Sequence, residues 1–344
     1  MQNPPTDVPE KREDFCQRLV HVISDSRLFL MGIATIVVMM FHWGPIANHT
    51  TILSRHGHLG VELFFFLSGF SIYYSLSKSP SKKSFYSRRL WRIMPTCIIA
   101  GILLLWMWHK ALPRHYAFDQ ASPYLAFVGL DAWYVRSLLI FYLVSPFLYT
   151  WFHKTKHPLI AISLYSIIGF LLIFEPNPYG LMRFDLGFVG YQTIIWSIKR
   201  FVAFYIGMYV AHEAATRGNL RTLGVMALVS GTAFALIFIM TVLNKIPPYI
   251  RSTTEIFLFP CWGYVLYGIA MLQKYMPRAV CSGIRWMGVY SLEIYLVHTA
   301  LFYYLPRPHR LWFLPLAWAA SLLGAVLVNR LARWATGLIK KPTA

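Results

Sequence analysis

The feature that most constrains this chain is a series of apolar stretches, each long enough to cross a lipid bilayer. A helix needs about 20 apolar residues to cross a hydrocarbon core of about 30 Å, and such stretches recur from Leu28 almost to the C-terminus. Only 13% of the residues are charged and 57% are hydrophobic, whereas roughly 25% of an ordinary soluble domain is charged. The chain is therefore predicted to be an all-α, polytopic transmembrane helical bundle. A secreted domain, a Rossmann enzyme and a nucleic-acid-binding protein are excluded.

The length rule predicts ten membrane spans. They cover residues 28–44, 60–77, 93–109, 132–151, 158–174, 193–212, 222–243, 254–273, 286–305 and 311–332. An even number of spans places both termini on the same side of the membrane. The predicted domains are an N-terminal tail (1–27), one transmembrane domain (28–332) and a C-terminal tail (333–344).

The distribution of Lys and Arg predicts which side the termini occupy. The segments on the side of the termini carry 21 of the 32 Lys and Arg residues, the opposite segments carry 10, and Arg136 lies within a span. Positively charged segments stay in the cytoplasm, so both tails are predicted to be cytoplasmic. The expected location is the cell (inner or cytoplasmic) membrane. This role accounts for most of the net charge of +19, and the remainder is available for an anionic ligand or lipid.

The cysteines predict neither disulfides nor a metal site, and the N-terminal residues do not predict a cleaved signal peptide. The four cysteines form no CxxC pair and no Cys/His metal spacing, so neither a disulfide framework nor a metal site is predicted. Residues 1–24 are polar and mixed in charge, unlike a cleavable signal peptide.

Ionisable residues within the spans indicate where a functional site lies, because inserting each one costs about 2.5–3.5 kcal/mol. His42 ends the first span and Glu62 begins the second, and fewer than twenty residues join the two ends. A carboxylate beside an imidazole fixes its tautomer and raises its basicity, which suits a general base. We therefore expect His42 and Glu62 to be catalytic. The alternative is that His42 lies at the interface and only caps its helix.

Further ionisable residues lie in the same outer half of the predicted bundle. Arg200 and Glu255 lie near the outer ends of the sixth and eighth spans. Tyr295 and His298 are three residues apart in the ninth span, on one helical face. Each could be a structural contact, but together with His42 they predict a polar cavity at one depth.

One arginine lies inside a predicted span. Arg136 follows Trp133 at the membrane entrance. Interfacial aromatics commonly anchor a helix, whereas a cation several residues inside needs an acceptor. Trp133, Arg136, Arg200, Tyr295 and His298 are the candidate contacts for an acceptor substrate or an oxyanion.

Residues 78–92 carry six positive charges and no acid. Such a run commonly anchors a span against anionic lipid. The alternative is a phosphate clamp, because Arg presents a planar fork to phosphate oxygens. Arg88, Arg89 and Arg92 occupy about one helical turn.

Six segments occur in a fixed order from the first to the ninth span. They are GIATIVVMMFH (32–42), GHLGVELFFFLSGFSIYYSL (57–76), FYSRRLWRIMP (85–95), WYVRSLLIFYLVSPFL (133–148), RFVAFYIGMYVA (200–211) and MGVYSLEIYLVH (287–298). Together they resemble the acyltransferase-3 family, the integral-membrane O-acyltransferases that modify bacterial surface glycans. The resemblance implies ten core helices with a cytoplasmic N-terminus, in agreement with the topology derived from the charges.

The resemblance also implies the chemistry. His42 falls on the family's catalytic histidine. The family's donor is a cytoplasmic acyl-CoA, typically acetyl-CoA, which acts as a co-substrate and not as a bound cofactor. We expect its phosphates to bind Arg88, Arg89 and Arg92. The expected partners are acyl-CoA, a polysaccharide or lipid-linked oligosaccharide whose sugar hydroxyl accepts the acyl group on the far side, and membrane lipid; no nucleic acid is expected.

The chain departs from the family pattern at one position. Family members carry an arginine eleven residues before the catalytic histidine, where this chain has Met31. Arg27 lies one turn further toward the cytoplasm on about the same helical face. We therefore count Arg27 among the expected donor-binding residues.

Two other interpretations remain open at the level of sequence. The chief rival is a carrier or flippase for a glycan or lipid-linked intermediate, with buried charges lining its path. A catalytically inactive family member is the third. The acceptor also stays open among exopolysaccharide, O-antigen, capsule, glycolipid and lipid-linked oligosaccharide.

Overall fold

The computed structural model describes residues 15–43, 56–78, 81–111, 133–173, 186–216, 218–243, 245, 250, 254–304 and 313–339. Within these ranges all regular structure is helical and no strand occurs, so the predicted all-α fold is confirmed. In this described part of the chain, six helices are long and apolar enough to cross a membrane, or seven if one bent pair counts as a single span. The count of ten spans and the cytoplasmic placement of the termini stay predictions.

Each predicted span overlaps one or more of the observed helices. In chain order they are α1 (Phe15–Asp25), α2 (Arg27–Trp43), α4 (Leu59–Ser77), α5 (Lys82–Ala111), α8 (Trp133–Lys154), α9 (Pro158–Ile173), α10 (Leu186–Thr216), α11 (Arg221–Val242), η1 (Glu255–Cys261), α13 (Trp262–Leu272), η2 (Gln273–Tyr275), α14 (Arg278–Val289), α15 (Ser291–Tyr304) and α16 (Phe313–Ile339). The predicted span ends near residues 44, 132, 174, 305 and 311, and the outer parts of both predicted tails, lie outside the described residues.

Two elements differ from the expectation. Helix α1 lies within the predicted N-terminal tail, bends 68° away from α2 and buries Cys16, Leu19 and Ile23. The predicted ninth span is divided, because α14 ends at Val289 and α15 begins at Ser291. The sequence did not reveal the break between them. Helix α14 is amphipathic, so its apolar residues and those of α15 form one continuous stretch of high average hydropathy.

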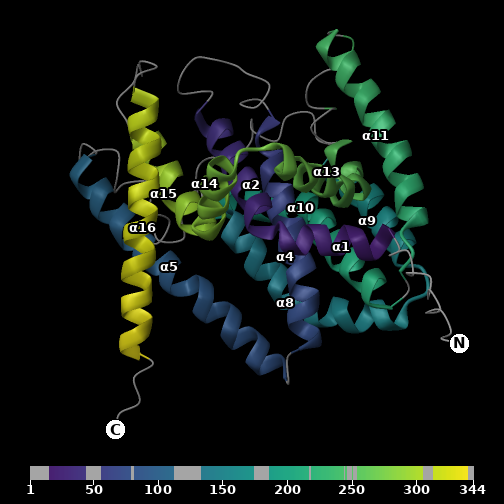
Figure 1. Ribbon diagram of the computed structural model, residues 1–344, viewed down its shortest axis with the longest axis horizontal. Coiled ribbons are helices and arrows are strands. Elements are labelled where there is room, and N and C mark those ends of the chain that lie inside the picture. The colour runs from purple at the N-terminus through teal and green to yellow at the C-terminus, as the bar shows by residue number, and fades with distance from the viewer. Residues whose placement is uncertain are drawn as a thin grey trace, which may run out of the picture.

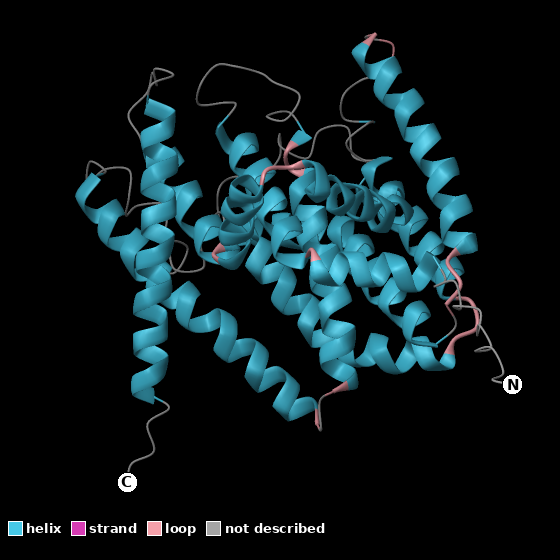
Figure 2. Cartoon of the chain, viewed as in Figure 1, coloured by secondary structure: helices cyan, strands magenta, loops and turns pink. Residues whose placement is uncertain are grey.

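The buried centre of the bundle consists of α4 and α10 (Figure 1). Two-thirds of the membrane-length window of each is buried, against 6% for α11. In Figures 1 and 2, α11 and α16 stand at opposite edges of the bundle. Large apolar side chains on α11, including Leu228 and Leu236, are exposed. Exposed apolar helices at the rim are typical of a protein whose surrounding solvent is lipid.

Helices α4 and α10 pack through two glycines that face each other's backbone. A methyl group on Gly69 of α4 would collide with the carbonyl oxygen of Phe204, and one on Gly207 of α10 would collide with that of Phe66. Lipid tails are as apolar as the helices, so association depends on close packing of this kind. These glycines therefore set the distance between the two central helices.

A second pair of glycines brings α2 into close contact with α14. A methyl group on Gly32 would collide with the carbonyl oxygen of Ile284, and one on Gly288 with that of Leu28. The contact holds the start of α15, which follows α14 after one residue, beside α2. It therefore fixes the position of α15 relative to the helix that carries His42.

Gly288→Ala tests the α2–α14 contact. The added methyl cannot be placed without moving a backbone, and we expect it to lower stability by about 1–3 kcal/mol. Gly283→Ala is the matched control on the same helix, because nothing lies within 4 Å of its added methyl and Ala favours a helix over Gly. The measurement is the apparent melting temperature in detergent. Equal melting temperatures for the two variants would contradict the proposed packing.

Candidate functional site

Two histidines from different helices meet at the end of α2. The His42 Nδ1 atom lies 2.9 Å from His298 Nε2 of α15, and the His298 Nδ1 atom lies 2.7 Å from the carbonyl oxygen of Ile294. His298 is 1% exposed. The sequence predicted both residues at one depth, and the structure places their rings in contact.

The hydrogen bonds of this pair determine its tautomers. A carbonyl oxygen only accepts, so His298 Nδ1 carries the proton that it donates to Ile294. In the neutral ring His298 Nε2 is then an acceptor, and His42 Nδ1 must donate to it. The proton on His42 therefore sits on Nδ1, and its Nε2 retains a lone pair. This is the form of imidazole that acts as a general base.

The structure corrects the predicted partner of Glu62. Among the described residues Glu62 does not bond to His42; its Oε1 accepts a hydrogen bond from Nη1 of Arg200 on α10. Both side chains are nearly buried, with exposures of 3% and 8%. A buried carboxylate is stabilised more by the permanent charge of a guanidinium than by a neutral imidazole. Glu62 therefore joins α4 to α10, and His298 takes the orienting place beside His42.

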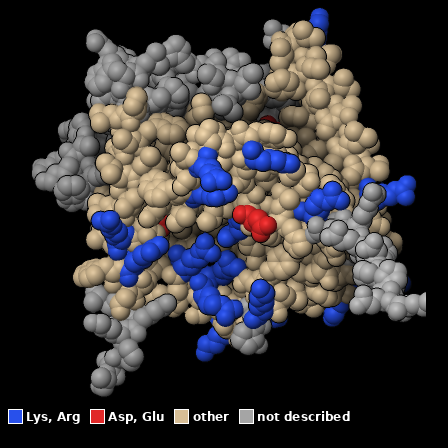
Figure 3. Space-filling view, viewed as in Figure 1, with Lys and Arg blue, Asp and Glu red and all other residues tan. Residues whose placement is uncertain are grey.

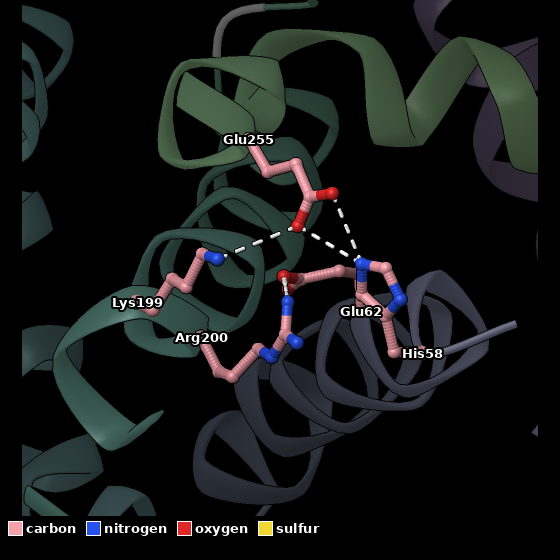
Figure 4. A network of polar contacts seen from close by, with 5 residues as sticks. All are labelled: His58, Glu62, Lys199, Arg200 and Glu255. Carbon is pink, nitrogen blue, oxygen red and sulfur yellow. Dashed lines mark hydrogen bonds and ion pairs between the residues drawn. The ribbon is translucent and has the colours of Figure 1, made fainter. Parts of the chain in front are cut away.

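A second ion network adjoins this pair (Figure 4). Both carboxylate oxygens of Glu255 lie 3.0 Å from His58 Nε2, and one lies 3.5 Å from Lys199 Nζ. The His58 ring also lies edge-on to Phe41, the neighbour of His42, with centroids 5.5 Å apart. Three helical elements, α4, α10 and η1, thus contribute charged groups to this region, and His58 connects it to α2 through Phe41.

A cavity of about 440 Å³ opens at the end of α2 opposite His42, where Arg27, Leu28 and Met31 line it. This volume is within the range of ligand pockets. Its described lining residues come from α2, α4, α5, α8, α14, α15 and α16. On α2, α5, α15 and α16 the lining residues lie at the ends that the charge distribution predicts to be cytoplasmic.

Four arginines line this cavity: Arg27, Arg89, Arg92 and Arg333. Three of them were predicted as donor-binding residues. The fourth expected member, Arg88, is not among the described lining residues; it is exposed and donates to Ser84. On the face drawn in Figure 3, many Lys and Arg side chains and few acids are visible.

Arg27 lies on the same face of α2 as Met31, which stands where the family has an arginine. Both residues line the cavity, so they share one face of α2. The Nε atom of Arg27 is buried and has no hydrogen-bond partner among the described residues. A buried donor of this kind requires an acceptor, which an anionic ligand would supply.

Aromatic rings form the part of the cavity nearest the histidines. Phe64, Tyr134 and Tyr295 line it, and the Tyr134 and Tyr295 rings lie 5.2 Å apart. The Tyr295 ring in turn contacts the His298 ring at 6.0 Å. One tyrosine therefore stands between the cavity and the histidine pair.

The remaining predicted contacts lie on the α8–α10 side. Arg136 Nε donates to the hydroxyl of Thr193 at 2.9 Å, which supplies the acceptor that the sequence required. The Trp133 ring packs edge-on against Trp196 at 4.5 Å, and the Arg200 guanidinium lies 6.0 Å from the Trp133 ring. These contacts join α8 to α10.

The fold and the site thus define a helical membrane protein with an arginine-lined cavity at one end of α2 and a pair of histidines at the other. The comparisons identify its family. Residues 29–334 match the family described as Acyltransferase domain, and the chain belongs to this acyltransferase-3 family. It is also 25% identical over 277 residues to the protein named "Putative acetyltransferase ORF330" of Acidianus two-tailed virus, covering 72% of this chain and 82% of the viral protein. No solved structure matches the chain.

Sequence reasoning missed several residues of this site. Asn329 and Arg333 line the cavity from α16, and their spacing of four residues on an apolar helix was a usable signal. His58 gave no such signal, because it lies at the start of α4, where polar residues are common. Lys199 lies within α10, but the sequence alone assigns it only to the charges that set the topology.

The Glu62–Arg200 pair makes a prediction about stability. Arg200→Met leaves a carboxylate buried without its cation, so we expect a loss of about 3–5 kcal/mol. The double variant Glu62→Leu/Arg200→Met removes both charges and should regain most of that loss. Melting temperatures in detergent measure both effects. A double variant as unstable as the single variant would argue against the pairing.

Proposed function

We propose that this membrane acyltransferase moves an acyl group, most simply acetyl, from cytoplasmic acyl-CoA to a hydroxyl of an extracytoplasmic or lipid-linked glycan. The observation that carries the proposal is the alignment of the arginine-lined cavity, Tyr295 and the histidine pair along α2 and α15. His42 lies 15 residues beyond Arg27 on α2, a rise of about 22 Å. An extended pantetheine arm has comparable reach.

The arginines would bind the phosphates of the donor. Arg27, Arg89 and Arg92 supply planar donor groups from two helices, and the fork of each guanidinium matches a phosphate. Arg89 is held in place between the rings of Phe85 and Tyr142, each 5.7 Å away. A positioned, multiply charged clamp suits a CoA better than a neutral ligand.

His42 would then act as the general base. Its Nε2 takes the proton of the sugar hydroxyl as the hydroxyl oxygen attacks the carbonyl carbon of the thioester. The C–S bond breaks, and the protonated His42 returns the proton to the departing thiolate. Catalysis of this kind accelerates a reaction by roughly 10²–10⁴-fold. His298 does not touch the substrate; it positions His42 through the Nδ1 hydrogen bond.

Tyr295 would donate to the developing oxyanion. It lines the cavity and its ring contacts that of His298. A donor aimed at the developing charge lowers the barrier without reorganising. A translocation path without catalysis, as in a carrier, does not need an oriented imidazole.

Variants of the histidine pair test the general base. We expect His42→Ala to reduce acetyl transfer at least about 100-fold, and His298→Ala to reduce kcat by up to about 100-fold through misplacement of the imidazole. The assay is transfer from radiolabelled acetyl-CoA to glycan in membranes containing the protein. His157→Ala, at the exposed start of α9, is the control. Normal transfer by folded His42→Ala protein would refute the mechanism, and no transfer by the wild type would favour a carrier.

The arginines provide a matched test of donor binding. Arg89→Gln and Arg92→Gln should each raise the KM for acetyl-CoA about tenfold or more, because a hydrogen bond to a charged group is lost. Arg88→Gln is the control, one residue away on the same helix and outside the described cavity lining, and its KM should not change. An equal response of all three variants would indicate a general surface effect and no clamp.

A further inference from the structure

The arginine-lined cavity contains one carboxylate among its described lining residues. Glu293, in the first turn of α15, is 5% exposed. A site that bound only phosphates would be weakened by a buried negative charge, because like charges repel strongly at short range. We therefore expect Glu293 to have a role other than phosphate binding.

The contacts of Glu293 leave part of its carboxylate available. Its Oε1 accepts a hydrogen bond of 2.6 Å from Nδ2 of Asn329 on α16. Its other oxygen makes no hydrogen bond with the described part of the chain, and no described cation forms an ion pair with it. Asn329 also lines the cavity, so its side-chain carbonyl adds an acceptor. The two side chains thus form one polar unit in the cavity wall.

The pair lies between the arginines and the histidines. Helices α15 and α16 run antiparallel, because Glu293 meets Asn329 while Val297 meets Gly324. Arg333 is one turn from Asn329 in one direction, about 6 Å along α16. His298 is five residues from Glu293 in the other direction, about 7.5 Å along α15.

This position matches one part of the proposed donor. In a CoA thioester, the arm that joins the diphosphate to the sulfur contains two secondary amides and a hydroxyl. A carboxylate accepts hydrogen bonds from amide N–H and hydroxyl groups, and an asparagine side chain both donates and accepts. Hydrogen bonds to an ionised acceptor are also the stronger ones.

We propose that Glu293 and Asn329 form a binding site for the amide groups of the pantetheine arm. This inference rests on the proposed acyl-CoA donor. It divides the cavity into a phosphate-binding part formed by the arginines and an amide-binding part formed by this pair. The amide-binding part places the thioester at the level of Tyr295 and discriminates against donors whose chains are purely hydrocarbon.

The experiment measures binding to the purified full-length protein in detergent by isothermal titration calorimetry. Three ligands separate the two parts of the cavity. CoA carries both the phosphates and the amides, pantetheine carries only the amides, and adenosine 3′-phosphate 5′-diphosphate carries only the phosphates. No acceptor glycan is needed.

Glu293→Leu and Asn329→Leu should each raise the Kd of pantetheine about tenfold, and Asn329→Leu should raise the Kd of CoA by the same factor. The Kd of the adenosine nucleotide should stay unchanged in Asn329→Leu and should fall in Glu293→Leu, where a charge that repels the phosphates is lost. Retained nucleotide binding also shows that the variants are folded. Arg92→Gln is the reciprocal control, since it should weaken CoA and the nucleotide and leave pantetheine unchanged. Glu293→Gln, which keeps an acceptor oxygen, should weaken pantetheine less than Glu293→Leu does.

The outcomes distinguish a failure of the amide site from a failure of the proposed acyl-CoA donor. Unchanged pantetheine binding in Glu293→Leu and Asn329→Leu would overturn the amide site. Equal losses for all three ligands would also overturn it, because the pair would then only pack α15 against α16. Wild-type protein that binds neither CoA nor the nucleotide would instead refute the proposed donor.

Discussion

The arrangement of the site depends on helices that approach until their backbones touch. Gly69 and Gly207 bring α4 against α10, and Gly32 and Gly288 bring α2 against α14. In lipid there is no hydrophobic force between helices, so close contact of small residues supplies the association. The first contact sets the spacing at which Glu62 reaches Arg200 across α4 and α10. The second fixes the start of α15, and with it the depth at which the two histidines meet.

The polar groups that result fall into two sets at opposite ends of the bundle. The arginines of the cavity lie where α2 begins, and the histidine pair and its neighbouring ion network lie where α2 ends. Charges in an apolar bundle must be paired or must serve a ligand. The network around Glu62 and Glu255 is paired internally and joins helices, whereas the cavity holds more cations than the described chain neutralises. The charges around Glu62 and Glu255 are therefore structural, whereas the arginines of the cavity are available to bind a ligand.

Much of the fold could be predicted from the sequence, because length and hydropathy determine a membrane helix almost alone. The cost of ionisable groups in lipid singled out His42, the run of positive charges singled out the arginines on α5, and the family resemblance supported both. What the sequence could not supply were contacts between distant segments. Nothing local indicates that the partner of His42 is His298 and not Glu62, because 256 residues separate the two histidines. The division between α14 and α15 was also hidden, since one amphipathic face continues into the next apolar helix.

The aromatic closure of the cavity has a consequence for the cell's ion balance. A passage that extends through much of a bilayer would dissipate the proton and sodium gradients if water filled it. The rings of Phe64, Tyr134 and Tyr295 narrow the route toward the histidines, and the guanidinium groups at its mouth raise an electrostatic barrier to cations, as positively charged constrictions do in selective pores. The same groups proposed to hold an anionic donor thus also insulate the membrane around it.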